Sequence, residues 1–371
     1  MTAPAPAGGG VPAGGGVPAG GAAPAGARPE VHVVLPGDID DPATPSGGNH
    51  YDRRVCAGLA DAGWRVHEHP VPGDWPTPGP AARADLAARL AALPDGAVVL
   101  LDGLVVSVTP QELEAQADRL RLVVLVHMPR DDAAEARALA AATAAVATSE
   151  WTRRRLLDRY GLPADRVHVA VPGVDPAPPV AGTAAGTALL CVAALAPHKG
   201  HDVLLAALAA VADLPWRCAC VGTLTRDPAH VRRLRRQADG SGLTGRVELL
   251  GPRTGPALAA AYAAADLLVL ASRGETYGMV VTEALARGIP VLATDVGGVP
   301  EALGHAPDGV RPGLLVPPDD PAALAGALRA WLGDAGLRER LRRAARARRP
   351  ALTDWSTTST ILAAVLKGAA T

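Results

Sequence analysis

The segment Ser272–Leu303 combines acidic residues and glycines at the carboxyl end of an expected strand. Glu275 precedes a helix that Gly278 opens, and Glu283 lies about 7.5 Å further along its axis. The amides and macrodipole of a helix N-terminus favour a phosphate, and carboxylates accept hydrogen bonds from vicinal hydroxyls. The pair therefore suits a nucleoside diphosphate sugar, with one glutamate on the sugar and the other on the ribose. Solvated glutamates are also common at helix starts, so the spacing alone is weak evidence.

A lysine and two glycines follow other expected strands and would act on the same ligand. Lys199 follows the strand expected over residues 187–195, where its ammonium group would supply a point charge for a diphosphate. Gly47 and Gly48 lie in the loop after the first strand, and glycine lets backbone amides approach an anion closely. Each feature also has a common structural explanation, since such a lysine is usually a surface residue and a Gly-Gly pair is usually a flexible turn.

The chain divides into two halves in which short apolar strands alternate with helices. Strands are expected at 31–36, 64–71, 97–104, 121–128, 145–148 and 166–173 in the first half, and at 187–195, 216–222, 246–251, 267–272, 290–294 and 313–317 in the second. Helices are expected between them, in the first half near 51–63, 80–93, 110–120, 132–143 and 150–161. This alternation predicts right-handed βαβ units and parallel sheets. The expected fold class is α/β, with two Rossmann-like, doubly wound domains facing across a cleft.

Ligands of open α/β sheets bind at the carboxyl ends of the strands, which draws attention to three further polar residues. His127 ends the strand expected at 121–128 and would face the mouth of the cleft. Asp102 also ends a strand and is a weaker candidate for the acceptor side, and His50, just past the two glycines, is weaker still. A lone histidine is more often a satisfied structural residue than a catalytic one.

Composition excludes several classes of protein. Lys plus Arg number 36 and Asp plus Glu 37, so the formal net charge of −1 argues against binding to nucleic acid through bulk charge. Four cysteines are too few for a disulfide scaffold and fit reduced thiols and a cytoplasmic location. Residues 1–29 hold 24 Ala, Gly or Pro residues, which predicts a disordered tail, and show no secretory signal. Uninterrupted apolar runs are too short for a membrane-spanning helix.

The region around the two glutamates resembles the donor-binding signature of family-4 retaining glycosyltransferases of the GT-B type. The matching residues lie in two runs: Ala284, Leu285, Ala286, Gly288, Pro290 and Val291, then Gly297, Gly298, Pro300 and Glu301. Further matches are the glycine loop and first helix (45–66), the inter-domain region (147–175), the lysine segment (192–208) and Trp355-Ser356-Thr357. The resemblance thus extends over nearly the whole chain after the tail.

The resemblance implies a GT-B architecture with an acceptor-side domain over 30–173, a linker over 174–186, a nucleotide-sugar domain over 187–350 and a C-terminal helix over 351–371 that crosses back. It implies that His127, Lys199 and Glu275 act in catalysis, with the glycine loop closing over the donor and His127 lining the donor sugar. Donor contacts are expected from Gly47, Gly48, Lys199, Arg253, Glu275, Thr276, Tyr277, Gly278, Met279 and Glu283. It implies no obligatory metal and no cofactor.

One position departs from the family pattern. The family usually has an arginine five residues before the lysine, where this chain has Ala194. One of two cations expected on the diphosphate is therefore missing, and Arg253 and Arg273 are the candidates to replace it.

The activity expected is transfer of a hexose from a UDP- or GDP-sugar to an unidentified small-molecule, glycan or lipid acceptor. Two alternatives stay open: a nucleotide-sugar-binding protein without transfer activity, and an epimerase that shares the two-domain architecture. The run 338–349 holds seven arginines and one glutamate. Such a helix can lie on anionic lipid, but a solvated face is favoured.

Overall fold

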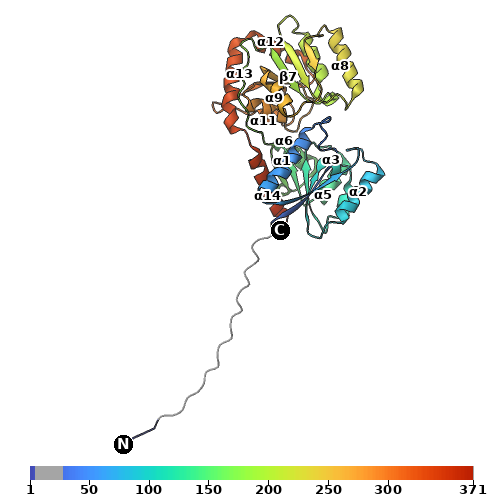
Figure 1. Ribbon diagram of the computed structural model, residues 1–371, viewed down its shortest axis with the longest axis vertical. Helices are drawn as coiled ribbons and strands as arrows, with labels where there is room; N and C mark the ends of the chain where they lie inside the picture. The colour runs from blue at the N-terminus through green and yellow to red at the C-terminus, as the bar shows by residue number, and fades with distance from the viewer. Residues whose placement is uncertain (5–27, 371) are drawn as a thin grey trace.

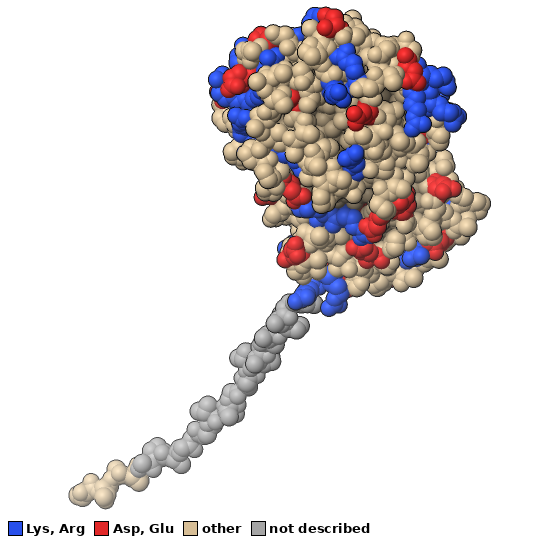
Figure 2. All heavy atoms as spheres, turned by 45° about the horizontal axis from the view of Figure 1, so that its top comes forward, with Lys and Arg blue, Asp and Glu red and all other residues tan. Residues whose placement is uncertain are grey.

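A computed structural model of the chain, which describes residues 1–4 and 28–370, shows two α/β domains joined by an extended segment (Figure 1). Most of the expected tail, residues 5–27, lies outside the described residues. The face shown in Figure 2 carries both acidic and basic side chains. Among the described residues, no helix is both long and apolar enough to span a bilayer.

The first domain is built on a parallel sheet of six strands in the order β2-β1-β3-β4-β5-β6. The strands are β1 (Glu30–Pro36), β2 (Arg65–Val71), β3 (Val98–Asp102), β4 (Arg121–Val126), β5 (Ala144–Ala147) and β6 (Val167–Val169). The central strands β3 and β5 are buried along their whole length, because helices cover both faces of the sheet.

The second domain repeats this plan, with a parallel sheet in the order β12-β11-β10-β7-β8-β9. Its strands are β7 (Ala188–Val192), β8 (Arg217–Val221), β9 (Val247–Leu249), β10 (Leu267–Leu270), β11 (Val291–Thr294) and β12 (Gly313–Val316). The two sheets confirm the expected pair of Rossmann-like domains.

Helices cover both faces of each sheet. In the first domain they are α1 (Gly47–Asp61), α2 (Pro80–Ala91), α3 (Gly103–Val106), α4 (Pro110–Glu114), α5 (Ala133–Ala141) and α6 (Glu150–Tyr160). In the second they are α7 (His201–Ala209), α8 (Pro228–Gly240), α9 (Gly255–Ala263), α10 (Met279–Ala286), α11 (Val299–Leu303), α12 (Pro321–Gly333) and α13 (Ala335–Arg348), and α14 (Trp355–Ala369) ends the chain. Short 3-10 turns span Ala164–Arg166, Pro197–Lys199 and Arg349–Ala351.

Each sheet has a point at which the strand order reverses. In the first sheet β1 lies between β2 and β3, and in the second β7 lies between β8 and β10. Connections leave the carboxyl ends of the two strands on either side of such a point in opposite directions, which opens a crevice for a ligand. The candidate site residues lie in the loops that follow β1, β3 and β4 in one domain and β7 and β10 in the other.

Arginines of the basic run hold the segment between the domains in place. Residues 170–187, which include the expected linker, contain neither helix nor strand. Arg342 donates to the carbonyl of Thr183 at 2.6 Å, and Arg349 donates to the carbonyl of Ala177 at 2.8 Å. These side chains thus bind backbone carbonyls of the same chain, which gives the basic run a structural role.

The C-terminal helix α14 packs on the first domain, beside α1 (Figure 1). Thr358 donates its hydroxyl to the carbonyl of Val171 at 2.8 Å, and the amide of Val174 donates to the carbonyl of Thr353 at 2.9 Å. Leu362 and Leu366 of α14 belong to the same apolar core as Val55 of α1.

Several expected elements end earlier in the structure than the sequence indicates; the strands expected at 166–173 and 187–195, for example, end at Val169 and Val192. The strand expected at 97–104 stops at Asp102, because the Asp102 carboxylate accepts the amide of Leu104 and begins the short helix α3. The helix expected at 110–120 stops at Glu114, and turns connect it to β4.

Candidate active site

Lys199 and Glu275 form an ion pair at the reversal point of the second sheet. The Lys199 Nζ atom lies 2.6 Å from Oε1 of Glu275, and the Ser272 hydroxyl donates to the same oxygen at 2.8 Å. The side chains of Lys199 and Glu275 are only 18% and 10% exposed. Lys199 comes from the loop after β7 and Glu275 from the loop after β10, so the parallel neighbours β7 and β10 bring together residues 76 positions apart.

Two glycines let the backbone behind Glu275 pack closely. The amide of Gly298 donates to the carbonyl of Glu275 at 3.0 Å. A Cβ atom on Gly297 would lie 1.7 Å from that carbonyl oxygen, and Gly297 has a φ of +56°. A Cβ atom on Gly298 would lie 2.1 Å from the carbonyl oxygen of Thr276. Only glycine fits at these positions, which explains the Gly-Gly pair and fixes the place of Glu275.

The helix α10 begins beside this pair without a side-chain cap. Its N-cap is Gly278, with a φ of +90°, and no side chain accepts from its first amides. The amide of Val281 donates to the carbonyl of Gly278, which leaves the amides of Met279 and Val280, among the residues that the structure describes, to bind an anion. Tyr277 is 7% exposed and packs in the core of the second domain, where burial raises the pKa of its hydroxyl to about 12. An anion bound at this helix end would therefore meet the backbone of Tyr277 and Gly278 and not the buried tyrosine hydroxyl.

Glu283 is held on α10 by a tyrosine from α9. The fully buried Tyr262 donates its hydroxyl to Oε2 of Glu283 at 2.7 Å. Burial first, and then the carboxylate of Glu283, raises the pKa of Tyr262 well above its usual value. Arg287 lies over the Tyr262 ring, 4.5 Å from its centroid, and donates to the backbone carbonyl of Glu283. The tyrosine therefore remains a hydrogen-bond donor that orients Glu283.

Gly47 and Gly48 were expected in a loop, but in the structure they are the first two residues of α1, because Ser46 already caps the helix. Both glycines lie close to other residues of the expected site. A Cβ atom on Gly48 would lie 3.3 Å from the His127 ring, and one on Gly47 would lie 3.4 Å from Sδ of Met279, the first residue of α10. The hydroxyl of Ser46 accepts the amide of Asn49 and begins α1. The N-terminus of α1 therefore lies between His127 and the uncapped end of α10.

His50 lies at the boundary between the domains, away from Asp102. Its ring meets the Trp355 ring edge-on, with centroids 5.5 Å apart. Burial lowers the pKa of His50, and the carboxylate of Glu283 partly opposes that shift. The charge of Glu283 thus acts on His50, whose assignment to the acceptor side stays a prediction.

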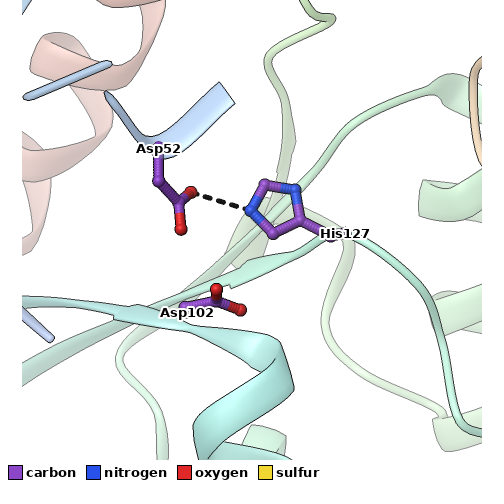
Figure 3. A group of neighbouring side chains, drawn as sticks. All are labelled: Asp52, Asp102 and His127. Carbon is purple, nitrogen blue, oxygen red and sulfur yellow. Dashed lines mark hydrogen bonds and ion pairs between the residues drawn. The ribbon is translucent and has the colours of Figure 1, made fainter. Parts of the chain in front are cut away.

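His127 belongs to a buried group with two carboxyl side chains (Figure 3). Its Nε2 atom lies 2.7 Å from Oδ1 of Asp52, a residue of α1. Burial would lower the pKa of His127, but the carboxylates of Asp52 and Asp102 raise it to about 9. Burial, followed by the negative charge of Asp52, raises the pKa of Asp102 to about 8. Among the residues that the structure describes, no other group of three acidic, His or Cys side chains is close enough to hold one cation.

The two arginines proposed to replace the cation missing at Ala194 differ in the structure. Arg273 forms ion pairs with Asp202 at 2.7 Å and Asp319 at 2.6 Å, so its charge is already compensated. Arg253 has neither an ion pair nor a hydrogen bond with any residue in 1–4 or 28–370 and lines a hollow beside α9. Neither arginine contacts Lys199 or Glu275.

The sequence analysis missed three residues that hold the candidate site together: Asp52, Tyr262 and Ser272. Asp52 directly follows Tyr51 on α1, and both side chains are buried. An acidic residue on the apolar face of a helix was the available signal, because such a position requires a partner. Tyr262 and Glu283 lie 21 residues apart on different helices, and no sequence pattern joins them.

Two family models match the chain, one in each domain. Residues 27–178 match the model described as Glycosyltransferase Family 4, and residues 185–348 match the model described as Glycosyl transferases group 1. The D-inositol 3-phosphate glycosyltransferase of Jonesia denitrificans is 35% identical over 242 residues, which are 60% of this chain and 56% of the relative. The enzyme of that name from Salinispora tropica is 36% identical over 57% of this chain and 48% of its own. The chain thus spans about half the length of these curated relatives.

Solved structures share the fold over almost the whole chain. The sucrose-phosphate synthase of Thermosynechococcus elongatus superposes with a TM-score of 0.73 at 22% identity, covering 92% of this chain and 99% of its own. Anabaena HepE, solved with UDP and glucose, superposes with a TM-score of 0.72 at 20% identity, covering 92% of this chain and 100% of its own. The family models, the relatives and the two reversal-point loops agree, and the chain belongs to the family-4 glycosyltransferases of GT-B architecture.

Proposed function

We propose that the protein is a retaining glycosyltransferase that transfers a hexose from a UDP- or GDP-sugar to an acceptor hydroxyl. The observation that carries this proposal is the arrangement around Lys199 and Glu275. An ammonium group and a carboxylate, 2.6 Å apart, lie in the connections after β7 and β10, and the second of these leads into the uncapped helix α10. Phosphate and sugar hydroxyls are the groups that such a set binds together, because the lysine and the amides favour an anion and the carboxylate favours a diol.

Different residues in and near α10 bind different parts of the donor. Glu283, oriented by Tyr262, accepts hydrogen bonds from the ribose. The free amides after Gly278 and the ammonium group of Lys199 hold the diphosphate, and Glu275 binds the sugar hydroxyls. Lys199 and Glu275 neutralise each other without a ligand, so donor binding exchanges their direct ion pair for contacts with the donor. Gly47 and Gly48 cover the donor from the other domain.

The reaction proposed needs no covalent intermediate on the protein. The glycosidic bond from the sugar carbon to the diphosphate oxygen breaks while the acceptor oxygen bonds to the same carbon on the same face. The acceptor proton passes to a phosphate oxygen of the departing diphosphate. Lys199 and the α10 amides stabilise the charge that grows on that group, a contribution that is usually a large part of catalysis.

The acceptor is proposed from the relatives alone. Those matched at 34–36% identity are named D-inositol 3-phosphate glycosyltransferases, so inositol 3-phosphate is the first acceptor to test. Its phosphate would need a cation on the acceptor side of the cleft. Glycan and lipid acceptors form the rest of the panel.

Transfer can be tested with UDP- and GDP-hexoses labelled in the sugar. Thermal-shift measurements first identify the donor, since a ligand at 100 Kd adds about 2.7 kcal/mol of stability. Incubation with the acceptor panel should then give a labelled product whose anomeric configuration matches that of the donor. If the donor binds but is neither transferred nor slowly hydrolysed, the binding-protein alternative is favoured. An epimerised donor would favour the epimerase. An inverted product would contradict the retaining mechanism.

A further inference from the structure

Asp52, Asp102 and His127 present a charge problem in the interior of the first domain. Asp52 and Asp102 are each 3% exposed, and the His127 side chain is 16% exposed. If all three were ionised, two negative charges and one positive charge would leave an uncompensated charge away from water. Such a charge is strongly unfavourable, so the group must take up either a proton or a cation.

The hydrogen bonds point to a proton between the two carboxyl groups. Oδ1 of Asp52 accepts from His127, whereas its buried Oδ2 has no hydrogen-bond partner among the described residues. Oδ1 of Asp102 accepts the amide of Leu104 at 2.6 Å, which leaves the other Asp102 oxygen free to carry a proton. A proton there supplies the donor that Oδ2 of Asp52 lacks and makes the group neutral.

The surrounding groups offer no competing partner. Tyr51 packs edge-on against the His127 ring at 5.3 Å, but its hydroxyl donates to the carbonyl of Ala170. Gly48, in the first turn of α1, packs against the ring. Within residues 28–370, Nδ1 of His127 has no hydrogen-bond partner, so its N–H is available to a ligand.

We propose that Asp102 keeps a proton and donates a hydrogen bond from it to Asp52, and that the ionised Asp52 thereby holds His127 as an imidazolium beside the N-terminus of α1. Asp52 and Asp102 are positioning residues, and the group that meets the ligand is Nδ1–H of His127. The fixed positive charge lies on the side of the cleft opposite Lys199. It compensates in part for the cation missing at Ala194. This role toward the donor rests on the proposed function, whereas the charge state of the group does not.

The charge of His127 can be measured without activity by NMR of protein labelled at the histidine Cε1 positions, with the resonance assigned from the variant His127→Gln. We expect His127 to be charged at pH 7 and to lose its proton at least two pH units later than an unperturbed histidine. A neutral His127 at pH 7 in the unaltered protein would overturn the proposal.

The matched variants Asp52→Asn and Asp102→Asn separate the two carboxyl groups. Asp52→Asn removes the negative charge and should leave His127 neutral at pH 7. Asp102→Asn should leave His127 charged, because an asparagine amide donates to Oδ2 of Asp52 as the protonated acid does. If Asp102→Asn discharges His127 as fully as Asp52→Asn, then Asp102 is ionised and the shared proton does not exist.

A divalent cation is the competing occupant, and the same resonance detects it. Dialysis against EDTA, followed by Zn²⁺, Mg²⁺ or Mn²⁺, should leave the His127 signal and the melting temperature unchanged. A shift that the metal reverses would overturn the proposal in favour of a cation site.

Activity provides the final test. Asp52→Asn should lower kcat tenfold or more with little change in nucleoside diphosphate binding, and Asp102→Asn should lower kcat by a smaller factor. Equal kcat in Asp52→Asn and the unaltered protein would overturn the role toward the donor. If the unaltered protein transfers no sugar, the proposed function fails while the NMR result still decides the charge state.

Discussion

The carboxylate of Glu301 in the second domain accepts the backbone amide of Glu150, the first residue of α6 in the first domain, at 2.9 Å. The adjoining amide of Trp151 lies 3.4 Å from the same oxygen. The contact joins the two domains directly. It also places a negative charge at a helix N-terminus, where such a charge is stabilising.

Glu301→Ala should loosen the contact between the domains. The contact between the domains should become weaker by about 0.5–1 kcal/mol, because the amides at the start of α6 then bind water. Small-angle scattering of the ligand-free variant should show a larger radius of gyration, with each domain still folded by circular dichroism. Glu339→Ala, on the exposed face of α13, is the control and should change neither quantity. Identical scattering curves for Glu301→Ala and the unaltered protein would contradict the role given to Glu301.

Gly297→Ala should cost both stability and activity. Its φ of +56° is unfavourable for alanine, and the added Cβ would lie 1.7 Å from the carbonyl oxygen of Glu275. Gly309→Ala is the matched control, because Gly309 has a φ of +81° but no atom within 4 Å of the added Cβ. The control should lose about 1–2 kcal/mol, the cost of the backbone conformation alone. Urea denaturation should show a clearly larger loss for Gly297→Ala, with kcat reduced only in that variant.

The sheets were predictable from the sequence because buried parallel strands are short apolar runs, such as Leu267–Leu270. The type and approximate position of such a strand do not depend on how its side chains pack. The meeting of Lys199 and Glu275 followed from the same logic, since both come after strands at one edge of one sheet. Element ends were less predictable. The strand β3 ends at Asp102 because the Asp102 side chain caps the short helix α3. That cap forms only if the following residues adopt a helical conformation.

Contacts between helices far apart in sequence could not be predicted. The basic run 338–349 looked like a solvated or lipid-facing surface, yet Arg342 and Arg349 bind carbonyls of the inter-domain segment. Tyr262 has no pattern that links it to Glu283. Such pairs depend on the orientation of whole helices, which periodicity does not specify.

Tyr262→Phe should mainly raise the donor KM. Phenylalanine keeps the ring in the core but removes the hydroxyl that donates to Glu283 at 2.7 Å. A single hydrogen bond of this kind contributes about 1 kcal/mol, so we expect a fivefold rise in KM with kcat retained. Glu283→Ala should raise KM further. If Tyr262→Phe changes kcat and leaves KM alone, Glu283 does not act through ribose binding.

Glu275→Ala should mainly lower kcat, in contrast to Glu283→Ala. The breaking glycosidic bond gives the sugar positive charge, which the carboxylate of Glu275 stabilises more in the transition state than in the ground state. Glu275→Gln keeps an acceptor without the charge and shows how much of the effect is electrostatic. Lys199→Ala should weaken diphosphate binding by about 1.5–3 kcal/mol. Steady-state kinetics of the four variants, each with native melting behaviour, provide the test. Equal changes in KM for both glutamates with unchanged kcat would show that their roles are the same.

The stability of the protein should fall as the pH rises from neutral to alkaline values, and His127 should account for a separable part of the fall. The pKa of His127 is raised to about 9 in the folded protein, against 6.5 for a free histidine, because the carboxylates of Asp52 and Asp102 outweigh its burial. A raised pKa in the folded state contributes stability that is complete below pH 6.5 and is lost as the pH passes through 9. Asp102, with a pKa of about 8, acts in the same direction, since its folded form binds a proton that the unfolded chain has released. Free energies of unfolding from urea titrations at pH 6, 7, 8 and 9 should therefore decline less steeply for His127→Gln than for the unaltered protein. Parallel pH profiles for the two proteins would show that His127 carries no raised pKa.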